Sequence, residues 1–244
     1  MKGVVLAGGL GTRLRPLTSI TNKHLLPVYD RPMIFYPLQT LADAGIKDVM
    51  VVTGGFSAGS FMQLLGDGKE FGFDSLNYAY QTGEGGIAEA IGLAKAFIGN
   101  DKFVVALGDN ILENSIIDYV SSFAEQKEGA RILYKRVSDP RDYGVAEIVN
   151  GKVISIVEKP ENPVSDFAVI GVYMYDSSAF EIIENLKPSG RGELEVTDLN
   201  NAYIQRSQLQ ANEITGWWSD CGANIDNLLE ANNLAAEISK RKGN

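Results

Sequence analysis

Short runs of β-branched and other apolar residues recur along the chain, and over its first half they alternate with stretches of helical spacing. The runs predict strands at 4–6, 49–52, 103–107, 132–134, 153–157 and 169–173. The helical spacing predicts helices at 33–44, 57–65, 87–97 and 115–125. Strands that alternate with helices are typical of a parallel sheet covered on both faces. The pattern therefore predicts an α/β fold, Rossmann-like, with a mostly parallel central sheet.

The second half of the chain follows a different pattern. After Asp139-Pro140 the apolar runs are shorter, and polar turns such as Asn150-Gly151 separate them, which favours antiparallel pairing. Leucine and alanine recur at helical intervals over 224–241 and predict a closing helix. Because no repeat, linker or low-complexity tract interrupts the sequence, we expect one domain over 1–244 with antiparallel additions to its parallel core.

Composition narrows the class of protein. The 244 residues are 45% hydrophobic and 22% charged, and no apolar run reaches the roughly 18 residues of a membrane span. The chain enters its first strand pattern without the apolar stretch of a signal peptide, so we expect a cytoplasmic protein that binds no membrane. Cys221 is the single cysteine, which excludes an intramolecular disulfide and a cysteine-based zinc site.

Charge is unevenly distributed along the chain. The net charge of -9 argues against a broad nucleic-acid-binding surface. Residues 1–29, in contrast, contain Lys2, Arg13, Arg15 and Lys23 and no acidic residue. This basic segment indicates binding of a small polyanion, although cations that only decorate a loop would give the same local charge.

A glycine-rich loop, Gly8-Gly9-Leu10-Gly11, follows the first predicted strand. Ligands of open parallel sheets bind where loops leave the carboxyl ends of the strands, and glycines let backbone N–H groups approach phosphate oxygens. The dinucleotide fingerprint would need a glycine where Leu14 stands, and a Walker loop would need Gly-Lys-Ser/Thr. With Arg13 and Lys23 close by, the loop favours a triphosphate.

The segment Gly55-Phe56-Ser57-Ala58-Gly59 matches the nucleophile elbow of the α/β-hydrolases. That chemistry needs a histidine base after the serine, and the only histidine, His24, precedes it. The residues therefore exclude a hydrolase. We expect His24 to pack beside the phosphate loop without a catalytic role.

Six motifs in order relate the chain to a known family. They are GVVLAGGLGTRLRPLT with NKHLLPVYDRPMIFYPL, GDN at 108–110, YGVAE at 143–147, VEKP at 157–160, GRGELEVTD at 190–198 and WSDCG at 218–222. Over nearly its whole length the chain resembles the sugar-1-phosphate nucleotidyltransferases, and within them the glucose-1-phosphate thymidylyltransferases of nucleotide-sugar and polysaccharide biosynthesis. The resemblance implies in-line attack on the α-phosphorus of a nucleoside triphosphate, with pyrophosphate leaving, catalysed by positioning and electrostatics.

The resemblance also implies a magnesium site and three catalytic cations. Asp109 follows the apolar run 103–107, at the carboxyl edge of the sheet, and with Asp220 it would bind Mg²⁺, which proteins usually hold by one or two carboxylates plus phosphate and water oxygens. Without the resemblance, a strand-end turn for Asp109 and a helix N-cap for Asp220 would be the simpler interpretations. The catalytic residues implied are Arg13, Lys23 and Lys159. Arg15 either assists or forms a loop salt bridge.

Two groups of binding residues follow. The nucleotide site is expected to comprise Leu6, Ala7, Gly8, Gly9, Gly11, Thr12, Arg13, Gln81, Gly86 and Asp109. The sugar-phosphate site is expected to comprise Tyr143, Gly144, Glu158, Lys159, Ile170, Tyr173, Arg191 and Trp218. A plain core role competes for the aromatic members, and a solvated surface position competes for the cations.

Gln81 is the candidate reader of the base. A glutamine amide can pair with both N3–H and O4 of thymine or uracil, whereas cytosine presents the opposite pattern. Thymine and uracil differ by one methyl group, worth about 0.8 kcal/mol of burial. The choice of dTTP over UTP therefore rests on the resemblance.

The chain departs from its longer bacterial relatives in three places. It ends at Asn244, so we expect a short form without their C-terminal regulatory extension, their feedback site or their tetramer, and whether it forms a homo-oligomer stays open. QTGEGG at 81–86 replaces a proline-containing segment, and His24 stands where glutamine is frequent.

The expected reaction joins dTTP and α-D-glucose 1-phosphate to give dTDP-glucose and pyrophosphate, with Mg²⁺ as cofactor. A UTP-using or dual dTTP/UTP enzyme is the alternative. A glycosyltransferase would use GDN as its metal motif but would not need Arg13. A silent nucleotide-sugar sensor predicts loss of at least one of Arg13, Asp109, Lys159 and Asp220, and all four are present.

Overall fold

The structure is a computed structural model that describes residues 1–242. In it, the apolar runs of the first half form the parallel part of a nine-stranded sheet. Its parallel strands are β1 (Lys2–Ala7), β4 (Asp48–Gly54), β5 (Ser75–Gln81) and β6 (Phe103–Leu107), in the order β6-β1-β4-β5. Residues 3–7 of β1 are all buried, because helices cover both faces of the sheet. The predicted parallel core is confirmed.

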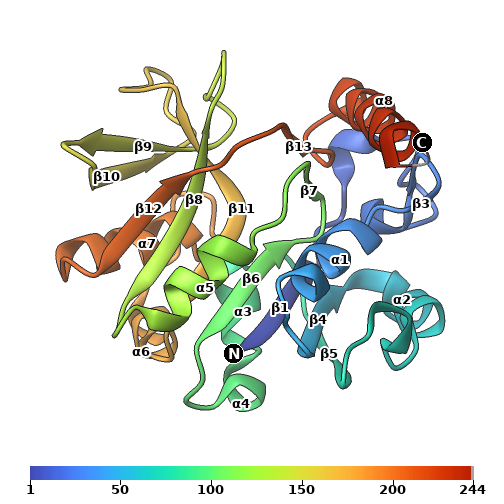
Figure 1. The fold of residues 1–244 in the computed structure, drawn as a ribbon, viewed down its shortest axis with the longest axis horizontal. Coiled ribbons are helices and arrows are strands. Elements are labelled where there is room, and N and C mark those ends of the chain that lie inside the picture. The colour runs from blue at the N-terminus through green and yellow to red at the C-terminus, as the bar shows by residue number, and fades with distance from the viewer. Residues whose placement is uncertain (243–244) are drawn as a thin grey trace.

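The second half adds five strands beside β6 that pair mostly antiparallel, on the left in Figure 1. They are β8 (Ala130–Arg136), β9 (Gly144–Val149), β10 (Lys152–Glu158), β11 (Phe167–Tyr175) and β12 (Leu209–Glu213). β11 pairs antiparallel with β6, β8 and β9, while β12 runs parallel to β8. Asn150 and Gly151 turn the β9–β10 hairpin with φ of 51° and 76°, as an Asn-Gly turn favours.

Helices cover the two faces of the sheet. α1 (Phe35–Asp43), α2 (Ala58–Leu65) and α5 (Ile117–Glu125) pack on the face of Val5 and Ala7. α3 (Ile87–Gly92), α4 (Lys95–Ile98), α6 (Ser178–Asn185) and α7 (Val196–Gln205) pack on the face of Val4 and Leu6. The single helix predicted over 87–97 is wrong: it divides into α3 and α4 directly after Gly92, where glycine lowers the helix propensity by about 1 kcal/mol.

The closing helix α8 (Ile225–Lys242) packs away from the main sheet, at the upper right of Figure 1. Leu228, Ala231 and Ala235 contact a third core with Leu14 and Cys221. The short strands of this region are β2 (Pro27–Val28), β3 (Arg31–Pro32), β7 (Asn110–Leu112) and β13 (Trp218–Asp220), and the 3₁₀ turns of the chain are η1 (Thr12–Leu14), η2 (Lys23–Leu25), η3 (Gly55–Ser57) and η4 (Lys69–Phe71). Within residues 1–242, no helix combines the length and the apolar character that a membrane crossing requires.

Candidate active site

A cavity of about 280 Å³ opens at the carboxyl edge of the parallel strands, between them and the antiparallel half. It receives the loop after β1 and the segment after β6 from one side, and the start of β9, the end of β10 and the middle of β11 from the other. The expected site residues that line it are Leu6, Gly8, Gly9, Arg13, Lys23, Gln81, Gly86, Asp109, Tyr143, Gly144, Glu158, Lys159, Tyr173, Trp218 and Asp220. Segments up to two hundred residues apart thus meet in one cavity.

Five expected residues lie outside the cavity lining. The side chains of Ala7 and Ile170 are buried in the core on the opposite face of the sheet, because neighbouring residues of a strand point to opposite faces. Gly11 and Thr12 begin the turn η1 behind the loop. Arg191 is held by carboxylates, with Nη2 2.9 Å from Glu195 Oε2. From the loop after β1 and the turn η1, the cavity is therefore lined by Gly8, Gly9 and Arg13.

Lys23 and Asp109 form a buried ion pair in the lining of the cavity. Lys23 Nζ donates to Asp109 Oδ2 at 2.5 Å, and both side chains are about nine-tenths buried. Burial, the largest influence, would raise the pKa of Asp109, but the charge of Lys23, the nearby His24 and the hydrogen bonds from Lys23 and Asn110 together outweigh it and hold this pKa well below its usual range. Burial likewise lowers the pKa of Lys23, and the charges of Asp109 and Asp220 more than offset it. The pair is therefore ionised at neutral pH.

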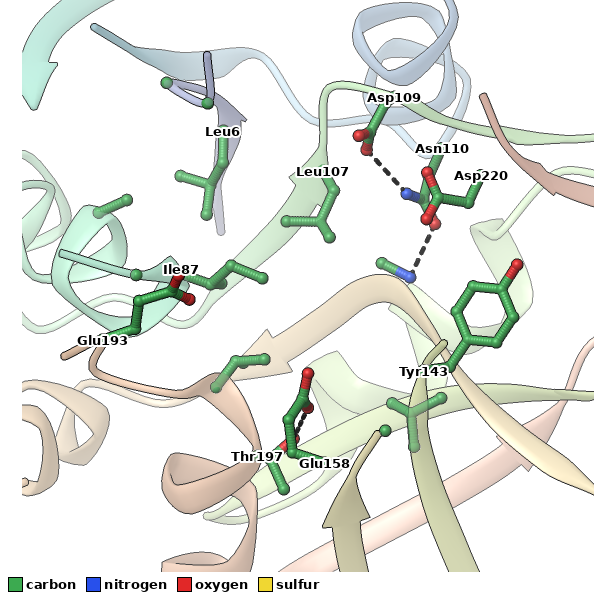
Figure 2. A pocket seen from close by; sticks show the side chains of 18 of the residues that line it. Leu6, Ile87, Leu107, Asp109, Asn110, Tyr143, Glu158, Glu193, Thr197 and Asp220 are labelled. Carbon is green, nitrogen blue, oxygen red and sulfur yellow. Dashed lines mark hydrogen bonds between the residues drawn. The ribbon is translucent and has the colours of Figure 1, made fainter. Parts of the chain in front are cut away.

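A short two-stranded sheet brings Asp220 to Asp109. β13 pairs antiparallel with β7 so that Asp220 lies opposite Asn110, and Cys221 N donates to Asp109 O at 2.9 Å. Figure 2 shows Asp109, Asn110 and Asp220 gathered at one end of the pocket. Burial, and next the charge of Asp109, raise the pKa of Asp220 to about 7. The carboxylates of Asp109 and Asp220 thus lie close together, and the positive charges of Lys23 and Arg13 only partly balance their negative charge.

This donor set fits a divalent cation. A cation between the two carboxylates would balance the repulsion that raises the pKa of Asp220. Within residues 1–242, no cluster of three or more histidine, cysteine or acidic side chains forms a closed metal site. Mg²⁺ suits such an open arrangement, because it is commonly bound by one or two carboxylates plus substrate phosphates and water.

Gly222 allows the ion pair to pack this closely. A Cβ on Gly222 would come 2.2 Å from Asp109 Oδ2 and 2.6 Å from Lys23 Nζ, shorter than real contacts of a Cβ. Glycine is needed here for space, and its place in the WSDCG motif follows from the packing of the ion pair.

His24 is buried close to Lys23 and Asp109, as expected. Its Nδ1 lies 2.7 Å from Asn22 Oδ1, which also accepts from the His24 backbone N at 2.9 Å. Burial, and next the charge of Lys23, lower the pKa of His24 to about 3. The ring is therefore neutral at physiological pH and adds no charge to the phosphate region.

The antiparallel half of the sheet and the segments beside it contribute the side chains expected to bind the sugar. Thr197 Oγ1 donates to Glu158 Oε2 at 2.6 Å, which Figure 2 draws, and this bond orients the Glu158 carboxylate. Lys159 has φ of 44° at the end of β10, and its backbone N donates to Tyr143 O at 3.0 Å. The rings of Tyr143 and Trp218 meet edge to face with centroids 5.0 Å apart. Carboxylate, ammonium and aromatic groups therefore line one wall.

Among the lining residues that the sequence reasoning missed, two make hydrogen bonds to expected site residues. Asn110 is buried, and its Oδ1 accepts from Trp218 Nε1 at 2.7 Å and from Gly171 N at 2.8 Å, while its Nδ2 donates to Asp109 Oδ1 at 3.0 Å. It links the proposed metal carboxylate to the sugar wall. Thr197 is the second. Both lie in the motifs GDN and EVTD, where sequence reasoning assigned no role to them.

Gln81 lies at the end of β5 beside the glycine loop. Its Nε2 donates to Glu89 Oε2 at 2.7 Å and to Gly86 O at 3.1 Å. Its Oε1 lies beside Gly8, where a Cβ would come 2.7 Å from it. The amide is therefore fixed by protein contacts on its NH₂ side.

Comparison with known proteins agrees with the geometry. The nucleotidyl transferase family matches residues 2–238. A glucose-1-phosphate thymidylyltransferase of Neisseria meningitidis serogroup A is 46% identical over 236 residues, which are 95% of this chain and 81% of that protein. A Bacillus anthracis protein assigned as a glucose-1-phosphate thymidylyltransferase, solved in complex with a sucrose, superposes with a TM-score of 0.92 and 51% identity over 96% of this chain and 95% of its own.

A more distant structure, UDP-glucose pyrophosphorylase complexed with UDP-glucose, superposes with a TM-score of 0.83 and 26% identity over 97% of this chain and 98% of its own. The matches to the family and to the Neisseria protein span nearly the whole chain, and the fold and the cavity described above agree with them. The chain belongs to the nucleotidyl transferase family.

Proposed function

We propose that this chain joins dTTP and α-D-glucose 1-phosphate to give dTDP-glucose and pyrophosphate. The observation that carries the proposal is the buried set of Lys23, Asp109 and Asp220, placed between the glycine loop and the wall of Glu158 and Lys159. A cavity with cations and acidic metal ligands in its centre suits two phosphorylated reactants. The relatives named glucose-1-phosphate thymidylyltransferase, at 41–46% identity, support the choice of substrates.

The proposed chemistry is an in-line displacement. An oxygen of the sugar phosphate forms a bond to the α-phosphorus of the triphosphate, the bond from that phosphorus to the oxygen bridging to the β-phosphate breaks, and pyrophosphate leaves with the electron pair. Arg13, Lys23 and Lys159 line the cavity. In this proposal Arg13 and Lys23 neutralise the triphosphate, and Lys159 holds the sugar phosphate. Their part is to position two anions and to balance the charge on the reacting phosphorus.

Asp109 and Asp220 would hold Mg²⁺ in this enzyme. The ion, when bound, supplies charge neutralisation and a fixed orientation for phosphate oxygens. Glu158, held by Thr197, accepts hydrogen bonds from sugar hydroxyls.

UTP is the second candidate nucleotide. Gln81 would contact the part of the ring that thymine and uracil share, and the similarity to a UDP-glucose pyrophosphorylase structure favours retaining this alternative. A matrix of nucleoside triphosphates against sugar 1-phosphates, followed by pyrophosphate release, tests both. We expect dTTP with glucose 1-phosphate to be best, and a tenfold preference for UTP would overturn the thymidylyl assignment.

Substitution of the carboxylates tests the metal assignment. Asp109→Asn and Asp220→Asn should each nearly abolish turnover, while the exposed Asp74→Asn control should retain it. Retained activity in both site variants would remove Mg²⁺ from these residues.

A further inference from the structure

Both N–H bonds of the Gln81 amide are engaged by the protein. Nε2 donates to Glu89 Oε2 at 2.7 Å and to Gly86 O at 3.1 Å, and an amide nitrogen has two hydrogens to give. The group that remains for a base is Oε1, which lies beside Gly8 at the cavity wall. In this arrangement Gln81 offers one acceptor, whereas the sequence suggested an acceptor and a donor.

Glu89 determines which way the amide faces. It lies in the first turn of α3, outside the cavity lining, and an ionised carboxylate can only accept hydrogen bonds. A Gln81 amide rotated by half a turn would place Oε1 against the Glu89 oxygen, and two acceptors in contact repel. The carboxylate therefore favours the orientation in which Oε1 points toward the base.

Gly85 provides the space for this carboxylate. A Cβ on Gly85 would come 2.1 Å and 2.5 Å from the two Glu89 oxygens and 2.3 Å from Cδ. Gly85 does not have the positive φ that would exclude alanine. An alanine here would therefore act by displacing the Glu89 carboxylate from Gln81.

We propose that Glu89 is a positioning residue for base selection: it fixes Gln81 with its oxygen toward N3 of the base, so that the site accepts an N3–H. Thymine and uracil carry that hydrogen, whereas N3 of cytosine is itself an acceptor. The proposal rests on the proposed use of a pyrimidine triphosphate. It assigns Glu89 no contact with any substrate.

Steady-state kinetics with dTTP, UTP and dCTP at saturating glucose 1-phosphate test the proposal. Glu89→Leu should raise KM for dTTP and UTP about tenfold, leave kcat within about twofold, and lower the preference for dTTP over dCTP about tenfold, since the longer bond to Gly86 O is then what holds Nε2 and the amide rotates more readily. Glu89→Gln keeps an acceptor oxygen at this position and should restore most of the preference.

Gly85→Ala supplies an independent probe that leaves Glu89 in the chain. It should reproduce the loss of preference, and the double variant Gly85→Ala/Glu89→Leu should be no worse than Glu89→Leu alone. The exposed Glu181, also in the first turn of a helix, provides the control Glu181→Leu, which should change neither KM nor preference.

The outcomes separate the two proposals. An unmodified enzyme that turns over no pyrimidine triphosphate overturns the proposed function and this inference with it. An active enzyme whose preference for dTTP over dCTP is unchanged in Glu89→Leu, or in which the effects of Gly85→Ala and Glu89→Leu add, overturns the role of Glu89 alone.

Discussion

Gly222→Ala is a sharp test of the buried centre, because it adds one methyl group where the ion pair packs. The new Cβ would come 2.2 Å from Asp109 Oδ2, 2.6 Å from Lys23 Nζ and 3.0 Å from Asp109 Cγ. Gly222 does not have a positive φ, so alanine fits its backbone. The substitution therefore acts on the carboxylate and the ammonium, which must separate or move together.

The cost can be bounded from the contacts. Removing one partner of a buried ion pair costs about 3–5 kcal/mol, and overpacking by a methylene group costs about 1–3 kcal/mol. Since both partners remain, we expect the free energy of unfolding to fall by about 1–3 kcal/mol, or Tm by about 2–12 °C for a chain of this length. Displacing Asp109 by about 1 Å should lower kcat about 100-fold.

The assay is pyrophosphate release, with Tm measured on the same samples. Gly59→Ala is the matched control, because the added Cβ meets nothing within 4 Å and Gly59, like Gly222, does not have a positive φ. The kcat of this variant should equal that of the unmodified enzyme. Should Gly222→Ala keep kcat within twofold while remaining folded, the central role of the ion pair would be refuted.

Two further predictions concern Thr197 and His24. Thr197→Val removes the hydrogen bond that orients Glu158, so KM for glucose 1-phosphate should rise about fivefold with KM for dTTP unchanged; Thr197→Ser should recover it, and equal effects on both KM values would contradict the assignment. His24 should show no titration between pH 5 and 8 in NMR spectra of the single histidine, because its pKa is lowered to about 3. Its unfolded pKa is near 6.5, so its contribution to stability is complete above pH 6.5 and falls by about 1.4 kcal/mol per unit as the pH drops toward 3. This contribution of His24 to the pH dependence of the unfolding free energy should be absent in His24→Gln. An NMR titration midpoint near 6.5 for His24 in the folded protein would be inconsistent with its burial.

Most of the strands that the sequence predicted are buried along a continuous apolar run, whereas β10 has only two buried residues. All six runs lie within strands, from β1 to β11. No run predicted β9, which has two buried residues. β5 and β12 were also not predicted, since β5 has only one buried residue and β12 has none. Their place in the sheet is fixed by pairing with β4 and β8, which no local pattern records.

The residues of the site likewise divide into those that the sequence could predict and those that it could not. Arg13 and Lys23 stand in a basic segment that contains the glycine-rich loop, and Asp109 stands at the end of a strand, so their place at the cavity could be predicted from position and charge, whereas the metal-binding role of Asp109 was implied by the resemblance. Asn110 and Thr197 act by holding other side chains, across 108 and 39 positions of the chain. Sequence spacing carries no such information. Strand alternation, which points the Ile170 side chain into the core, could have excluded it in advance.

The central claim is that the phosphates of the nucleotide are held against the loop of residues 8–23, with a divalent ion between Asp109 and Asp220. A crystal structure with dTTP and Mn²⁺ in place of Mg²⁺ tests it most directly, because the ion is located by its anomalous signal. The account predicts one peak within about 2.1–2.2 Å of an oxygen of each carboxylate, with triphosphate oxygens completing the coordination beside Arg13 and Lys23. A triphosphate bound away from residues 8–23, or an ion bound away from these two aspartates, would contradict it.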